Sequence, residues 1–181
     1  MVTRMLRNLF LWMVVTGVGL PPAYAQSGAE AYRVDAGDML RIQVYREKDL
    51  DREVRVDTNG TISYPLVGVI QVSGKTLREI ENLIAGRLRG RYFKNPTVTA
   101  TIIEYRAFYV NGEVEKPGSY PYQPGLNVRK AISVAGGLKE RASRRKIYVI
   151  RDKDPEGREI KATLDTPVGP GDIVTVDQSF F

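Results

Sequence analysis

The sequence of 181 residues contains no cysteine and no histidine. Without cysteine, the chain can form no disulfide bond and has no thiolate nucleophile. Without histidine, it lacks the commonest proton shuttle and, with sulfur also missing, the usual zinc ligands. Carboxylate pairs such as Glu113 and Glu115 remain, but they stand in polar stretches typical of a solvated surface. We therefore expect no catalytic residue, no bound metal and no cofactor.

Long apolar runs are scarce as well. The run LFLWMVVTGVGL at residues 9–20 has 12 residues, fewer than the about 20 that a membrane-spanning helix needs. Arg4 and Arg7 precede it, and the small residues of Ala23-Tyr24-Ala25 follow it, as in a cleaved signal peptide. We expect residues 1–25 to be removed on export, with a retained membrane anchor as the alternative. Gln26, the next residue, offers no cysteine thiol to which a lipid anchor could be attached.

A strong charge of one sign is also lacking. The formal net charge is +6, and removal of Arg4 and Arg7 with the signal peptide leaves 25 basic and 21 acidic residues, a net charge of +4. This excess is small, and most of it is scattered along the chain. It does not indicate a nucleic-acid partner.

The stretch GVIQVSGKT at residues 68–76 invites comparison with a phosphate-binding loop. Five residues separate Gly68 from Gly74 where that motif requires four, and three of them are β-branched. The stretch instead predicts a short extended segment followed by a helix. Thr76 is placed as the N-cap, and Glu79 completes a capping box. Apolar residues at spacings of three and four then predict a helix that runs to Leu88.

Alternating apolar residues predict strands in most of the remaining chain, which gives an α+β fold. In the first half, we expect a strand after residue 38, a hairpin over residues 53–68 that turns at Asn59-Gly60, and a strand at residues 97–105. In the second half, Pro117-Gly118 is expected as the centre of a type II turn, and Asn127 as the cap of a helix that ends at Gly136-Gly137. Further strands are expected at residues 147–151, 159–164 and 167–176.

One short pattern occurs twice. AGDMLRIQV at residues 36–44 and PGDIVTV at residues 170–176 both place Gly-Asp before an alternating apolar run. Glycine permits the turn, and an aspartate side chain can accept hydrogen bonds from nearby backbone N–H groups. A turn role explains Gly37 and Asp38, and likewise Gly171 and Asp172. A ligand role for the aspartates is the alternative.

These pieces resemble a known family when they are taken in order. YRVDAGDMLRIQV, VDTNGTISYPLVG, the helix start at residues 74–79 and NPTVTATI resemble the polysaccharide export domain of outer-membrane polysaccharide export proteins. VNGEVEKPGSYPY, AISVAGGL and VGPGDIVTV resemble the SLBB β-grasp domain that follows it in that family. The resemblance implies a lead-in at residues 26–31, an export domain at 32–105, an SLBB domain at 106–177 and a tail at 178–181.

The resemblance also implies a function. Members pass capsular or extracellular polysaccharide across the periplasm and outer membrane, and they assemble into rings around a channel. This chain resembles a short form that would depend on a separate outer-membrane protein and would meet an inner-membrane polysaccharide co-polymerase. A periplasmic sensor or scaffold that binds a glycan or small ligand without transport remains the alternative. A secreted glycan hydrolase is a third class, which would require a working carboxylate pair.

Two groups of residues are candidates for contact with a glycan. The stretch KERASRRK at residues 139–146 is rich in basic residues, and Arg141, Arg144 and Arg145 would bind carboxylates or phosphates of an acidic polymer. A solvated loop is the alternative interpretation of this stretch. Five aromatic residues lie close together in sequence, and core or interface packing explains them better than stacking on sugar rings. They are Tyr105, Phe108, Tyr109, Tyr120 and Tyr122.

Overall fold

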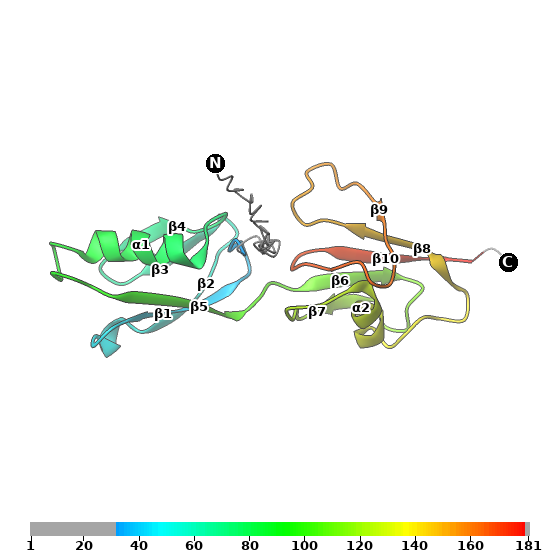
Figure 1. The fold of residues 1–181 in the computed structure, drawn as a ribbon, viewed down its shortest axis with the longest axis horizontal. Helices are drawn as coiled ribbons and strands as arrows, with labels where there is room; N and C mark the ends of the chain where they lie inside the picture. The colour runs from blue at the N-terminus through cyan, green and yellow to red at the C-terminus, as the bar shows by residue number, and fades with distance from the viewer. Residues whose placement is uncertain (1–31, 180–181) are drawn as a thin grey trace, which may run out of the picture. The chain divides into compact units, whose positions relative to one another are not determined.

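The computed structural model describes residues 32–179 (Figure 1). The predicted signal peptide, the lead-in at residues 26–31 and the last two residues of the predicted tail lie outside the described residues. The described part has the predicted α+β composition, with ten strands, two α-helices and one 3-10 helix. The strands are β1 (Met39–Val44), β2 (Arg52–Arg55), β3 (Thr61–Tyr64), β4 (Gly68–Gln71), β5 (Val98–Glu104), β6 (Phe108–Gly112), β7 (Gly118–Tyr120), β8 (Ala142–Ile150), β9 (Ile160–Lys161) and β10 (Ile173–Gln178). The helices are η1 (Lys48–Leu50), α1 (Leu77–Leu88) and α2 (Val128–Val134).

The first half of the described chain is built on an antiparallel sheet of three strands in the order β2-β1-β5, with β3 and β4 forming a separate antiparallel pair. Figure 1 shows α1 running along β5. Alternate residues of β1 are buried, and they join the buried face of α1 in one hydrophobic cluster. Burial of this apolar surface is the main force that holds the helix on the strands.

The second half is a five-stranded sheet in the order β7-β6-β10-β8-β9. The pair β6 and β10 is parallel, and the other neighbouring pairs are antiparallel. Phe108, Val110, Val174 and Val176 point to one face and form a second hydrophobic cluster with the buried residues of α2. The opposite face carries Tyr109 and other side chains that are at least partly exposed.

Helix α1 begins as the sequence predicts. The Thr76 hydroxyl accepts a hydrogen bond from the Glu79 N–H, and the Glu79 carboxylate accepts one from the Thr76 N–H at 2.7 Å. The backbone and side-chain hydrogen bonds from Thr76 lower the pKa of Glu79. The predicted capping box is therefore confirmed, and the GVIQVSGKT stretch serves as strand, turn and helix cap.

Within the described residues, no helix combines the length and apolar character needed to span a membrane.

The predicted hairpin over residues 53–68 is wrong. Its first arm, β2, pairs with β1, whereas β3 pairs with β4 through a turn that places Leu66 at a φ of 63°. Asn59-Gly60 does form a turn, in which only Gly60 has positive φ. The Asp57 side chain accepts hydrogen bonds from the N–H groups of Asn59 and Thr61. This turn redirects the chain between two sheets and does not join neighbouring strands.

The type II turn predicted at Pro117-Gly118 is also wrong. Such a turn needs positive φ at Gly118, but Gly118 is the first residue of β7 and pairs with Val110. The glycine with positive φ in this connection is Gly112, at 83°. A Cβ atom at Gly112 would overlap the Val176 carbonyl, so close packing of β6 against β10 requires glycine there.

The strands predicted near the carboxyl end differ in length from the observed ones. Strand β8 begins at Ala142, five residues before the predicted start, and β9 has only two residues. The basic stretch at residues 139–146 therefore enters β8 and is not wholly a loop. Arg144 and Arg145 are consecutive exposed residues, so apolar and polar residues do not alternate in the first half of β8. Without that alternation, the sequence does not indicate a strand at these residues.

The capping box offers a test of the fold. Replacement of Thr76 by alanine should lower the free energy of unfolding by about 1 kcal/mol, because the Glu79 N–H at the start of α1 loses its acceptor. Thr76→Ser keeps the hydroxyl and is the matched control, with an expected change within a few tenths of a kcal/mol. Urea denaturation of both variants measures the difference. Equal stabilities would show that the hydroxyl does not cap the helix.

Candidate functional site

The two Gly-Asp turns hold the buried charged side chains of the described chain, Asp38 at 0% and Asp172 at 4% exposure. Each carboxylate accepts a hydrogen bond from the N–H three residues earlier, from Asp35 at 2.9 Å and from Gly169 at 2.8 Å. The turn role expected from the sequence is therefore present at both positions.

Each aspartate also binds a backbone N–H and an arginine from another part of the chain. Asp38 accepts the Arg106 N–H at 2.8 Å, and the Arg106 guanidinium lies 3.3 Å from the same carboxylate. Asp172 accepts the Asp152 N–H at 3.1 Å and pairs with Arg151. The repeated sequence pattern thus marks a repeated structural unit, a buried carboxylate that fixes a turn and recruits an arginine.

Arg106 connects the two halves of the described chain. Its side chain is 12% exposed and donates to Asp38, to Asp152 at 2.9 Å and to the Tyr32 hydroxyl at 2.6 Å. The Tyr32 hydroxyl in turn donates to Asp38 at 2.7 Å. The pKa of Tyr32 is raised far above its ordinary value. Burial of the hydroxyl is the larger cause, and its hydrogen bond to the Asp38 carboxylate is the second. We call Tyr32, Asp38, Arg106, Asp152 and Asp172 the clasp.

Glycine is required at position 171, where the backbone of the turn passes close to the Asp152 side chain. Gly171 has a φ of 83°, and a Cβ atom there would overlap the Asp152 carboxylate. Its N–H donates to the Ala107 carbonyl at 2.9 Å, which places the turn directly beside the segment that carries Arg106. The Gly-Asp pattern therefore combines a close backbone approach with a buried acceptor.

A groove of about 530 Å³ lies beside the clasp. Its polar lining includes Arg55 and Glu104, which pair with each other at 2.8 Å, and Asp152 of the clasp. Its aromatic lining comes from Tyr105, Tyr109 and Tyr120. These tyrosines belong to the group of five aromatic residues for which packing is the expected role.

The aromatic residues divide into packed and open members. Phe108 is fully buried, and Tyr120 packs on it with ring centroids 5.9 Å apart. Tyr105 makes edge-to-face contacts with Tyr32 at 5.1 Å and with Tyr122 at 5.4 Å. Only Tyr109 is an open member of this group, with 45% exposure. Packing explains four of the five residues, and Tyr109 is left facing the groove.

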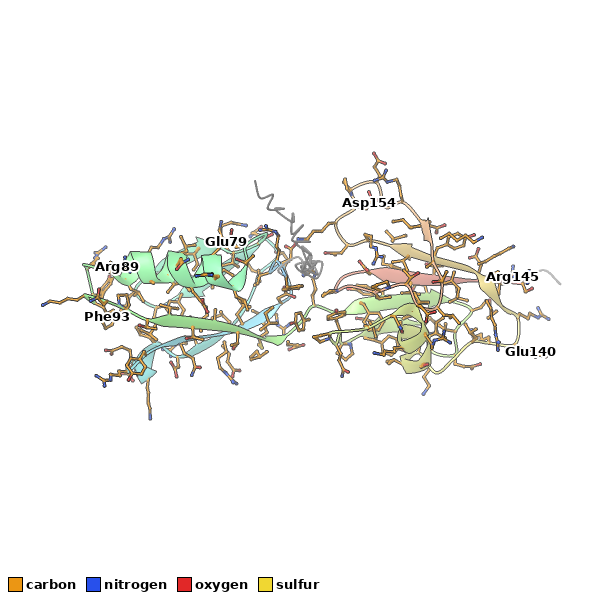
Figure 2. All side chains as sticks on the ribbon, in the orientation of Figure 1. Glu79, Arg89, Phe93, Glu140, Arg145 and Asp154 are labelled. Atoms are coloured by element: carbon orange, nitrogen blue, oxygen red, sulfur yellow. The ribbon has the colours of Figure 1, made fainter. Side chains whose placement is uncertain are left out.

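The basic candidates lie elsewhere. Arg141 precedes β8, and Arg144 and Arg145 lie in its first half. All three are exposed, and among the described residues no carboxylate forms an ion pair with them. Figure 2 labels Glu140 and Arg145 near this entry into the strand. None of these arginines lines the groove, so the structure does not bring the two candidate glycan contacts together.

The remaining motif glycines serve turns. Gly136 and Gly137 follow α2 with φ values of 87° and 99°, and the Gly137 N–H donates to the Ile132 carbonyl. The Asn127 side chain caps α2 by accepting the Lys130 N–H at 3.0 Å, as predicted. Over residues 32–179, no three acidic side chains are grouped so that they could hold a metal ion.

Comparison with known proteins agrees with this architecture. Residues 26–103 match the family described as polysaccharide biosynthesis/export protein, and residues 107–161 match the SLBB domain. The chain belongs to the polysaccharide biosynthesis/export protein family. The two matched segments meet at the clasp, because Arg106 stands between them and Asp38 and Asp152 lie one in each.

Three curated relatives are similar to the chain. The exopolysaccharide production protein ExoF of Rhizobium meliloti is 34% identical over 141 residues, which cover 68% of this chain and 34% of ExoF. The EPS I polysaccharide export outer membrane protein EpsA of Ralstonia solanacearum is 30% identical over 61% of this chain and 36% of EpsA. The polysialic acid transport protein KpsD of Escherichia coli is 28% identical over 63% of this chain and 22% of KpsD. The matched regions thus span about a third or less of the length of these relatives.

Sequence reasoning missed Arg106. A lone arginine carries no pattern, and the aspartate that it binds lies 68 positions earlier. The usable signal was the pair of Gly-Asp turns, since a turn aspartate that becomes buried requires a cation or several N–H donors. That requirement predicts a partner for each aspartate, either a basic side chain or a set of N–H donors, but it does not identify the residue.

The clasp can be tested by removing its cation. Arg106→Met should lower the free energy of unfolding by about 3 kcal/mol, because the buried Asp38 carboxylate is left without its counter-charge. Arg129→Met is the matched control, since Arg129 pairs with Asp165 across an exposed surface and should matter by less than about 1 kcal/mol. Chemical denaturation measures both. Similar small losses for the two variants would refute the structural importance of the clasp.

Proposed function

We propose that this protein is a periplasmic, ring-forming component of a polysaccharide export machine. It guides an extracellular or capsular polymer towards and across the outer membrane, and it performs no catalysis. The observation that carries the proposal is the presence of an export segment and an SLBB segment in one chain, in this order, in a member of the export family. The names of the relatives, which refer to exopolysaccharide production, export and transport, support the same role.

The two hydrophobic cores support a ring over a monomeric channel. Each core is filled by the chain's own side chains, such as Ile42 and Ile84 in one and Phe108 and Val174 in the other. Protein interiors packed in this way have no room for a polymer-wide passage. Any channel must then lie between copies, and a closed ring of head-to-tail contacts is the symmetric way to enclose one. A separate outer-membrane protein and an inner-membrane co-polymerase would complete the route.

A second function is favoured by one observation. The groove beside the clasp is a concave site at the junction of two domains, where ligand sites are common. A sensor or scaffold would use such a groove to bind a glycan without conducting it. The two functions differ in assembly, because a sensor needs no enclosed channel.

Gene deletion tests the role in export, and the oligomeric state distinguishes a ring-forming exporter from a scaffold. Deletion of the gene in its own strain should abolish surface polymer, and a plasmid copy should restore it. Electron microscopy of the protein purified with its membrane partners should show rings with a central lumen. Normal surface polymer in the deletion strain would contradict the export function. A monomer in the purified complex, with export lost, would instead support a ligand-binding scaffold.

The arginines at the start of β8 give a separate prediction about the polymer path. If the polymer is acidic, changing Arg141, Arg144 and Arg145 to glutamine should reduce exported polymer several-fold, because charge-assisted hydrogen bonds to its anionic groups are lost. The control changes Lys48, Arg78 and Lys94 to glutamine, which removes the same charge from other exposed positions. Quantitation of surface glycan at matched protein levels measures the effect. Equal export by the two triple variants would remove these arginines from the path.

A further inference from the structure

We propose that the groove beside the clasp binds a short uncharged segment of polysaccharide, roughly one or two sugar rings, against the open face of Tyr109. This inference rests on the proposed export function and names where the chain touches its cargo. The volume of about 530 Å³ falls within the range of about 300 to 1,000 Å³ typical of ligand sites.

The walls of the groove are held in place before any ligand arrives. Tyr105 lies between Tyr32 and Tyr122 in two edge-to-face contacts, and Tyr120 packs on buried Phe108 while its hydroxyl donates to the Lys116 carbonyl. The lining also includes Gly37 and Gly171 from the two turns of the clasp. A binding surface with fixed side chains loses little conformational entropy when a ligand binds.

Tyr109 and Ser119 form the open part of the groove. They are cross-strand partners on β6 and β7, both are exposed, and both point away from the hydrophobic core. The Tyr109 N–H donates to the Asp172 carbonyl at 2.9 Å, so the clasp turn holds the backbone of this residue. The apolar C–H face of a sugar ring can stack on the Tyr109 ring. The neighbouring Ser119 hydroxyl can exchange hydrogen bonds with a sugar hydroxyl.

The charges in the groove favour an uncharged sugar. Arg55 pairs with Glu104 at 2.8 Å, and Arg106 pairs with Asp152 at 2.9 Å, so the cations and carboxylates of the lining cancel. A carboxylate or phosphate on the ligand would meet as much repulsion as attraction. Sugar hydroxyls both donate and accept hydrogen bonds, which suits guanidinium donors and carboxylate acceptors that lie side by side.

The same lining argues against an apolar ligand. An apolar molecule in the groove would remove water from the partly exposed side chains of Arg55, Glu104 and Asp152 and return no hydrogen bonds. An oligosaccharide replaces that water with its own hydroxyl groups. The ligand class is therefore an uncharged sugar chain.

The test is a titration of the ¹⁵N-labelled chain with defined oligosaccharides, followed by NMR. Cellotetraose and maltotetraose are the neutral probes, and tetragalacturonate is the acidic one. We expect at least one neutral probe to shift the amide signals of Tyr109 and Ser119 at millimolar concentration. Tyr109→Ala should weaken this binding about tenfold, and Ser119→Trp should abolish it by filling the groove.

Tyr45→Ala is the matched control, because Tyr45 is 68% exposed and does not line the groove. It should leave the affinity unchanged. Unperturbed spectra elsewhere in each variant show that the fold is retained. The inference is overturned if no neutral probe shifts the groove signals, if Tyr109→Ala and Ser119→Trp bind as well as the parent chain, or if the acidic probe binds the groove more tightly.

Failure of the groove and failure of the export function give different results. If deletion of the gene abolishes surface polymer but no neutral probe binds the groove, the export function stands and the groove proposal falls. If deletion leaves surface polymer unchanged while the neutral probes bind through Tyr109, the groove stands as a glycan site and the export function falls.

Discussion

The junction between the two halves of the described chain depends on one buried ion pair, between Asp38 and Arg106. Asp38 is fully buried. Its carboxylate accepts hydrogen bonds from the backbone N–H groups of Asp35 and Arg106 and from the Tyr32 hydroxyl. It also pairs with the Arg106 guanidinium. A buried carboxylate with this many donors is well satisfied, whereas the same carboxylate without its cation is strongly destabilising. Because Arg106 also holds Asp152, the ion pair links the export segment to the SLBB segment.

This link also shapes the groove that is proposed to bind polysaccharide. The clasp turns at Gly37 and Gly171 line the groove, and the Asp172 carbonyl accepts the N–H of Tyr109. The backbone of the Asp172 turn therefore holds the strand that carries Tyr109, the residue proposed to touch polysaccharide. If the proposed export function holds, a fixed polar groove of this kind would hold a neutral sugar weakly and release it readily.

Local signals in the sequence predicted local structure well. Thr76 and Glu79 marked the start of α1, and the β-branched run at residues 97–105 marked β5, because caps and strand alternation act over a few residues. Strand partners were predicted less well. The turn at Asn59-Gly60 was assigned to a hairpin, although the strand before it pairs with β1. Arg106 was not found, because its partners are distant in sequence and its burial arises only from the tertiary fold.

The most direct test of the account is a ¹⁵N relaxation measurement of overall tumbling for the α1 and α2 regions of the parent chain and of Arg106→Met. If the clasp couples the two segments, both helices report one common rotational correlation time in the parent chain. The variant should then show two shorter, unequal times. Independent tumbling of α1 and α2 in the parent chain would contradict the claim that the Asp38–Arg106 pair joins the segments.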